Sequence, residues 1–470
     1  MTASEAASGS LLAAALSMTA VVLFLSAVLW IVVKRPGLAM IFFFVLFAFA
    51  WRLASVLYID LLGPIFSDQL VRDLGPGMAA VPLAVCQGFL IAALLYSFRR
   101  ERIRHLVEAG GLKFARLALP GGASIPGLAF LAATLFVVAL LAELLVRGPI
   151  PLFAGIERFD YTRLYGGPLH LRLLEWGPML AFQLGIFFAV PLLHDRPSDW
   201  RFGALFATLI LYLFLAGHRF SSLYVYSSFF IMPIGAVLMF RQGMSPQGEI
   251  VSRRILRHLT IAAGVLLVLI AVAVVYSYIV VRGEGAALAE KLSQRVLIQQ
   301  GEMWWITYDR VFLHGDWNGK YAAYKLFVDP FDPSRNSTMQ FLMEQALPLQ
   351  RAHYIIALGS AYTGGWPEVF FELGGPIGGF FLVALLAIVF CEFMFLLMRC
   401  FLEERFVTCV FLTPIMYALS IALVSGMVNS FVQVTFLIKI AVALLVYVAE
   451  DRWRSNPPLP RSRADSTKEA

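Results

Sequence analysis

The chain has 470 residues, of which 60% are hydrophobic and 14% are charged, and its mean hydropathy is +0.78. Soluble domains are about 45–50% apolar and about 25% charged, so this composition excludes a soluble enzyme, a disordered chain and a secreted disulfide scaffold. We attribute the net charge of +7 to basic residues on the cytoplasmic side of a membrane rather than to nucleic-acid binding.

Continuous apolar runs predict about eleven membrane-spanning helices, since one span needs about 20 residues. The predicted spans are 11–33, 38–58, 78–98, 124–146, 177–193, 202–217, 223–240, 259–281, 371–398, 406–425 and 430–449. The first run is too long for the apolar core of a signal peptide, so we interpret it as a retained helix. The expected fold is all-α, a polytopic transmembrane helical bundle with one large outer loop between helices 8 and 9.

Clusters of Lys and Arg alternate with these spans and predict the orientation. Every cluster falls on the cytoplasmic side if the N-terminus is periplasmic and the C-terminus cytoplasmic, so we expect a multi-pass protein of a bacterial inner membrane. The predicted organisation is helices 1–8 in residues 1–281, a partly helical periplasmic loop in 282–370, helices 9–11 in 371–449 and a disordered cytoplasmic tail in 450–470.

Motifs of soluble enzymes are missing from the sequence. It has no P-loop, dinucleotide-binding GxGxxG, HExxH or GxSxG pattern. The four cysteines, Cys86, Cys391, Cys400 and Cys409, lie in or beside apolar runs and form no CxxC pair. We therefore expect neither a disulfide framework nor a metal site, and no cofactor.

Arginine is frequent in the loops predicted to lie outside, where the positive-inside rule should deplete it. These arginines are Arg147, Arg158, Arg163, Arg172, Arg219, Arg282, Arg295, Arg310, Arg335 and Arg351. A guanidinium group offers paired donors that match phosphate oxygens, which favours an anionic, lipid-linked ligand; salt bridges or lipid headgroup contacts are the alternative. Arg219 stands out because its turn, 217–222, separates two apolar runs. Arg52, inside the second predicted helix, is expected to reach a cavity, and Lys439, inside the last, to pair with a carboxylate in the bundle; a purely structural role is the alternative for each.

A second pattern lies at the end of the large loop. Arg351 and His353 precede Glu368 and Glu372, and a glycine-rich helix start follows at 374–379. Glycine lets a backbone or ligand approach closely, and an imidazole can act as a general base near neutral pH. His353, Glu372 and Glu368 are therefore candidate catalytic residues; the alternative is that the glycines serve helix packing and His353 is a surface residue.

This layout resembles the bacterial O-antigen and exopolysaccharide repeat-unit polymerases (Wzy type) and, more distantly, the O-antigen ligases. The resemblance rests on the number of helices, the large outer loop in the C-terminal half and the Glu-x-x-Gly-x-x-Gly-like helix start that follows it. The segment 148–161 and the turn Gly217-His218-Arg219 are also similar to segments of those polymerases.

The resemblance implies polymerisation of oligosaccharide repeat units linked to undecaprenyl pyrophosphate, a glycosyl transfer without nucleotide sugar or essential metal. It implies that Arg219, Arg351, Arg163 and Arg158 bind the pyrophosphate. The implied partners are the lipid-linked oligosaccharide, membrane lipid, a chain-length regulator and a flippase, with no nucleic acid. Aromatic side chains would stack on sugars or anchor the protein at the membrane interface; they are Trp304, Trp305, Tyr321 and Trp366.

Two alternatives stay open. One is an O-antigen ligase or another polyprenyl-linked glycosyltransferase. The other is a lipid-linked sugar flippase or transporter, for which charged residues spread along many helices and short loops on both sides are expected. The nearly uncharged helices and the single large outer loop favour the enzyme.

Overall fold

A computed structural model describes residues 3–109, 125–156, 158–194, 196–218, 220–244, 288–327, 338–357, 362 and 364–455, together with the single residues 257, 261, 264 and 268. Most of these residues are helical. The first half holds α1 (Ala3–Lys34), α2 (Pro36–Ile41), α3 (Phe43–Leu62), β1 (Ile65–Ser67), β2 (Arg72–Leu74), α4 (Ala80–Ser97), α5 (Arg100–Ala109), α6 (Ile125–Arg147), α7 (Pro151–Ala154), α8 (Arg158–Leu164), α9 (Pro168–Leu193), α10 (Trp200–Leu215) and α11 (Phe220–Met244).

The second half is also helical and includes two π-helices and one 3-10 helix. It holds α13 (Leu288–Ser293), the π-helix η3 (Gln294–Ile298), α14 (Glu302–Thr307), the π-helix η4 (Tyr308–Leu313), α15 (Gly319–Phe327), α16 (Thr338–Ala346), α17 (Leu349–Ala357), α18 (Glu368–Leu402), α19 (Phe406–Ser425), the 3-10 helix η5 (Val428–Val432) and α20 (Val434–Ser455).

Eight helices of the described residues are long and apolar enough to cross a membrane. They are Leu11–Lys34, Phe43–Leu62, Ala80–Ser97, Pro126–Ala154, Pro168–Leu193, Ser221–Gln242, Glu368–Leu402 and Phe406–Ser425. The all-α membrane fold is therefore confirmed. Helix α10 is apolar but shorter than these. The predicted span 259–281 lies outside the described residues except at positions 261, 264 and 268.

Several helices have bounds that differ from the prediction: the predicted span 38–58 divides into α2 and α3, and α18 runs from Glu368 to Leu402 rather than over 371–398, so it starts inside the predicted loop. Helix α9 starts at Pro168 rather than at residue 177, because the polar residues before the apolar run belong to the same helix. The last predicted span divides into η5 and α20, which runs on to Ser455. The remainder of the predicted tail lies outside the described residues.

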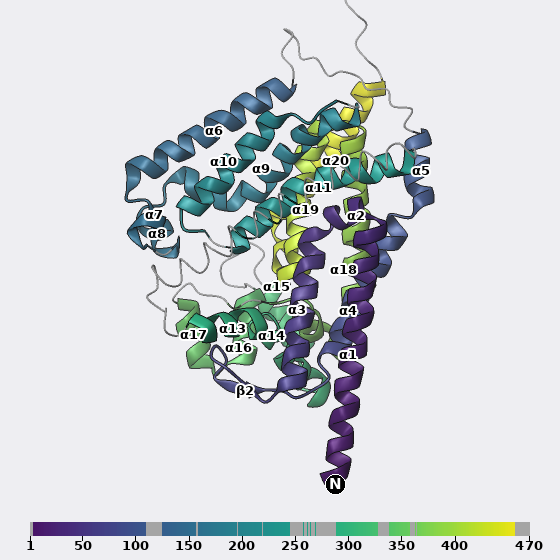
Figure 1. Cartoon of the computed structure of the whole chain (residues 1–470), viewed down its shortest axis with the longest axis vertical. Coiled ribbons are helices and arrows are strands. Elements are labelled where there is room, and N and C mark those ends of the chain that lie inside the picture. Colours follow the sequence, from purple (N-terminus) through teal and green to yellow (C-terminus); the bar gives the residue numbers. More distant parts are fainter. Residues whose placement is uncertain are drawn as a thin grey trace, which may run out of the picture.

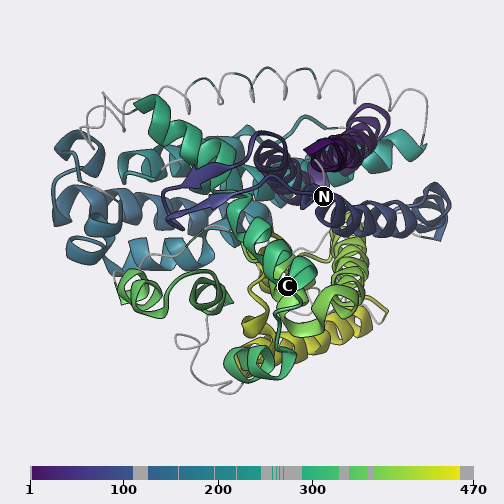
Figure 2. The same ribbon diagram turned by 90° about the horizontal axis from the view of Figure 1, so that it is seen from below.

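The described part of the large predicted loop folds as a layer of short helices at one end of the bundle. This loop layer, residues 288–327 and 338–357 with the hairpin β1–β2, lies at the same end as the start of α1 (Figure 1). Helix α5 and the end of α20 lie at the opposite end (Figure 1). Seen from below, the hairpin crosses the middle of the loop-layer end (Figure 2).

Side-chain hydrogen bonds join the hairpin to the loop layer. The strands pair antiparallel with Phe66 opposite Asp73. Ser67 donates to Glu302 Oε2 at 2.5 Å, and the Gln294 amide donates to the Phe66 carbonyl at 3.0 Å. These contacts bring a segment near the N-terminus against the second half of the chain.

Candidate functional site

Helix α18 starts inside the loop-layer end of the bundle and is interrupted after its second turn. Gly375 has φ +68° and ψ −172°, a conformation that a side chain disfavours. Pro376 follows and has no N–H for the helical ladder. The short first part of α18 therefore carries Glu368 and Glu372, one turn apart, into the junction between the bundle and the loop layer.

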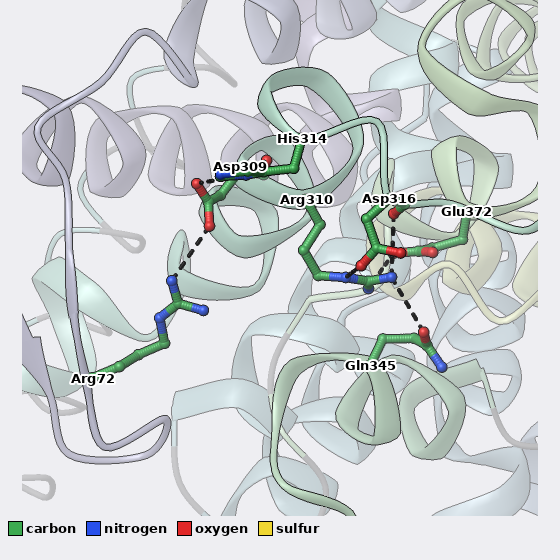
Figure 3. A network of polar contacts seen from close by, with 7 residues as sticks. All are labelled: Arg72, Asp309, Arg310, His314, Asp316, Gln345 and Glu372. Atoms are coloured by element: carbon green, nitrogen blue, oxygen red, sulfur yellow. Dashed lines mark hydrogen bonds and ion pairs between the residues drawn. The ribbon is translucent and has the colours of Figure 1, made fainter.

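Glu372 forms an ion pair with an arginine of the loop layer (Figure 3). Arg310 Nη1 lies 3.0 Å from Glu372 Oε1, and the Glu372 side chain is only 2% exposed. The same guanidinium donates from Nε to Asp316 Oδ2 at 3.1 Å and from Nη2 to Gln345 Oε1 at 3.2 Å. One arginine thus connects α18, α16 and the segment after η4.

Glu368 forms a second, deeper ion pair. Its Oε2 lies 3.7 Å from Arg52 Nη1, and both side chains are buried. Glu368 also accepts the Gly365 N–H at 3.2 Å, while Arg52 Nη2 donates to the Val424 carbonyl at 3.2 Å. Glu368 Oε1 is buried and has no hydrogen-bond partner. The pair connects α3, α18 and the end of α19.

Asp309, the neighbour of Arg310 in η4, connects the site with the hairpin (Figure 3). Its Oδ2 accepts from Arg72 Nη2 at 3.3 Å, and its Oδ1 lies 3.5 Å from His314 Nδ1. Two consecutive residues of one π-helix therefore hold β2 and the start of α18, respectively. Such π-helical turns are frequent at functional sites.

The predicted residues Arg351 and His353 lie on α17, close to this network but not in it. The His353 side chain is 59% exposed, and its Nε2 lies 3.4 Å from Glu344 Oε1. Arg351 Nη2 donates to the Gln69 carbonyl of the hairpin at 3.4 Å. Since Glu344 and Gln345 are neighbours on α16, this helix lies between His353 and Arg310.

The other predicted arginines belong to a different part of the molecule. Arg163 is 75% exposed and pairs with Asp160 at 3.1 Å. Arg158 Nη1 donates to Ser221 Oγ at 3.5 Å, at the start of α11. Figure 1 shows their helix, α8, away from α18. Arg219 lies outside the described residues.

Three of the predicted sugar-stacking aromatics are buried. Trp304 and Trp366 are 0% exposed and Trp305 is 7% exposed. Trp304 donates to the Ala79 carbonyl at 2.7 Å, and Trp366 stacks on Phe49 with ring centroids 4.0 Å apart. These rings pack the junction and present no face to a sugar.

Sequence reasoning identified the two glutamates but missed their partners. Arg310 appeared only as one of many outer arginines, and Arg52 as an isolated charge in a helix. Asp316 and Gln345 carried no signal at all. Within the described ranges, no group of three or more His, Cys, Asp or Glu side chains is placed to hold a metal ion.

Comparison with known proteins adds one match. The model of a family of unknown function (DUF6418) matches residues 332–440, which include α16, α17, both glutamates of α18 and the whole of α19. No curated protein and no solved structure matches the chain. The matched region contains Glu368, Glu372 and Gln345, whereas Arg52 and Arg310 lie before it.

Proposed function

We propose that the protein polymerises oligosaccharide repeat units carried on undecaprenyl pyrophosphate at the periplasmic face of a bacterial inner membrane. The observation that carries this proposal is the pair of glutamates at the start of α18, each against its own arginine. Glu372 meets Arg310 and Glu368 meets Arg52, where apolar helices adjoin the loop layer. A lipid-linked, anionic substrate needs apolar helices for its lipid and cationic side chains beside them for its charged headgroup.

The reaction requires a base and a stabilised leaving group. The acceptor hydroxyl oxygen bonds to the anomeric carbon of the donor while the bond from that carbon to the pyrophosphate oxygen breaks. In this proposal, Glu372 takes the hydroxyl proton and Arg310 stabilises the charge on the departing pyrophosphate. The two groups are already 3.0 Å apart. Arg351, Arg158, Arg163 and Arg219 remain candidates for binding the rest of the donor headgroup.

His353 is the competing candidate for the base. Its exposure makes it accessible, but its ionic neighbour is Glu344 rather than an arginine that could bind the leaving group. Glu372 offers the base and the cation in one contact, so we favour it. The proposed partners are membrane lipid, a flippase that delivers the repeat units and a chain-length regulator.

The test compares two glutamates of α18 in a strain that lacks the chromosomal gene. Glu372→Gln should abolish the polymer ladder, with turnover at least about 10²-fold lower if Glu372 is the base. Glu392→Gln is the matched control, because Glu392 lies 20 residues after Glu372 in the same helix and pairs with Arg102 of α5 at 2.7 Å. It should leave the ladder intact. A normal ladder with Glu372→Gln would exclude Glu372 as the base.

The buried Arg52–Glu368 pair keeps a transporter as the second candidate function, since charges within membrane helices often mark ion or substrate pathways. The two functions differ in where single repeat units accumulate in the Glu372→Gln strain. Units stranded on the periplasmic face support a polymerase, whereas units stranded inside support a carrier. Polymer that forms on the lipid but is not transferred further would support a ligase.

A further inference from the structure

The segment that contacts Arg310 next to its pair with Glu372 is short and exposed. Residues 314–318, here called the strap, connect η4 to α15, and all five are exposed. Gly315 has φ +64°, in the left-handed region that favours glycine. At the other end, Asn318 Oδ1 accepts the Tyr321 N–H at 3.0 Å and caps α15. The strap therefore has a conformationally free glycine near its first residue, and its last residue caps a helix.

Two side chains hold the strap over the start of α18. Asp316 accepts from Arg310 Nε through its carboxylate and from Arg310 Nη2 through its carbonyl, at 3.1 and 3.3 Å. Trp317 packs against the break in α18, where a Cβ added to Gly375 would lie 2.6 Å from its ring. Glu372 is only 2% exposed, so a substrate hydroxyl reaches it only after a neighbouring segment moves, and the strap is the exposed segment held to its partner Arg310 and to Gly375.

Of the two carboxylates that contact the Arg310 guanidinium, only that of Asp316 is exposed, while Nη2 donates to the neutral Gln345 amide oxygen and the Asp316 carbonyl. Its Nη1 side holds the buried Glu372, whereas its Nε side holds Asp316, whose side chain is 70% exposed. Ion pairs that involve an exposed carboxylate are weak. Nε and Nη2 form the planar fork that a phosphate group also fits. Two carboxylates share this one guanidinium, so an incoming anion must compete with the exposed Asp316 for the Nε side of Arg310.

We propose that Asp316 is a built-in competitor that occupies the diphosphate position on Arg310, and that binding of a diphosphate displaces it and moves the strap away from Glu372. The identity of the ligand as a lipid-linked diphosphate rests on the proposed function. The site thereby stays closed until the donor headgroup arrives. Water then has no access to the base in the absence of substrate.

The experiment measures binding to the purified full-length protein in detergent, with geranylgeranyl pyrophosphate as the probe. Asp316→Asn removes the competing charge and should tighten binding about two- to fivefold, the range expected for losing an exposed ion pair. Geranylgeraniol, which lacks the diphosphate, should bind both proteins equally. If Asp316→Asn tightens binding of inorganic pyrophosphate but not of geranylgeranyl pyrophosphate, the anion site is supported, and its ligand is a free diphosphate rather than a lipid-linked one.

Two controls separate this competition from a general effect of charge. Glu175→Gln removes a carboxylate from another exposed pair, with Arg172 at 2.8 Å, and should not change binding. The gain from Asp316→Asn should also vanish in an Arg310→Lys background, because the fork is gone. Three results would overturn the inference. Glu175→Gln could raise the binding affinity as much as Asp316→Asn, the rise from Asp316→Asn could persist with Arg310→Lys, or Asp316→Asn could cause no rise at all. Since no turnover is needed, failure to form polymer contradicts the proposed function alone.

Discussion

Ser67 donates a 2.5 Å hydrogen bond to Glu302, and this buried contact joins two residues 235 positions apart in the chain. It fixes the hairpin β1–β2 onto α14. Ser67 Oγ also accepts the Leu70 N–H at 3.1 Å, so the hydroxyl both donates and accepts. Glu302 Oε1, in contrast, is buried without a hydrogen-bond partner.

Stability should therefore depend on pH through Glu302. The pKa of Glu302 is raised from 4.5 to about 7, chiefly by burial, with the Ser67 hydrogen bond lowering it and the charge of Asp68 adding to the rise. Between these values the folded protein keeps a proton that the unfolded chain has lost. The stabilisation is complete below pH 4.5 and is lost as the pH rises to about 7, by roughly 3 kcal/mol in total.

Thermal unfolding of the purified protein between pH 5 and 8.5 measures this dependence. Glu302→Gln should flatten the profile and raise the melting temperature above pH 7. Glu290→Gln, an exposed glutamate of α13, should leave the wild-type profile unchanged. A wild-type melting temperature that stays constant over this range would contradict the prediction.

Loss of one partner of the Arg52–Glu368 pair should be strongly destabilising. Glu368→Met leaves the Arg52 guanidinium buried without its counter-charge, at a cost of about 3–5 kcal/mol. Replacing both residues by Met should recover most of that loss, because neither charge is then buried alone. The melting temperature and the yield of folded protein measure the effect. A double variant no more stable than the single one would show that the pair is not the cause.

Two glycines of α18 should respond to alanine in opposite ways. Gly375→Ala should destabilise the protein by at least about 1–2 kcal/mol, because φ is +68° and the new methyl group meets Trp317. Gly378 has no heavy atom within 4 Å of an added Cβ. Gly378→Ala should therefore be neutral or stabilise the helix by about 0.5–1 kcal/mol. Equal effects in the two variants would contradict the role of the break.

The predicted orientation can be tested by labelling with a membrane-impermeant maleimide. All four native cysteines are buried, so the wild-type protein should not react. Lys320→Cys, at an exposed position of α15, should react in intact spheroplasts. Lys34→Cys, at an exposed position in the last turn of α1, should react only after the membrane is permeabilised. Reaction of Lys320→Cys only after permeabilisation would reverse the orientation and place the site in the cytoplasm.

Hydropathy predicted helices best where an apolar run begins and ends next to polar residues or glycine. The predicted span 406–425 coincides with α19, since Arg405 precedes it and Gly426 ends it with φ +64°. The start of α9 was missed because residues 168–176 include His170, Arg172 and Glu175 and so do not continue the apolar run. In the structure His170 is buried and bonded to the Tyr212 hydroxyl at 2.8 Å. A polar residue that finds a partner inside the bundle cannot be recognised from composition.

The pairs at the site could not be predicted for a related reason. The glycine-rich start of α18 drew attention to Glu368 and Glu372, which is a local pattern. Their partners Arg52 and Arg310 lie on other helices. Apolar periodicity indicates which face of a helix is buried but not which helix packs against it. Non-local ion pairs therefore require the structure.

The π-helical turn that carries Arg310 makes the site sensitive to insertions and deletions. Hydrogen bonds in η4 run from i to i+5, so this turn holds one residue more than an α-turn. Each residue of an ordinary α-helix rotates the following side chains by about 100°. Deletion of one residue between Glu302 and Arg310 would restore an ordinary helix while turning the guanidinium away from Glu372. Proteins that share this site should therefore conserve the length of the interval as strictly as the arginine itself.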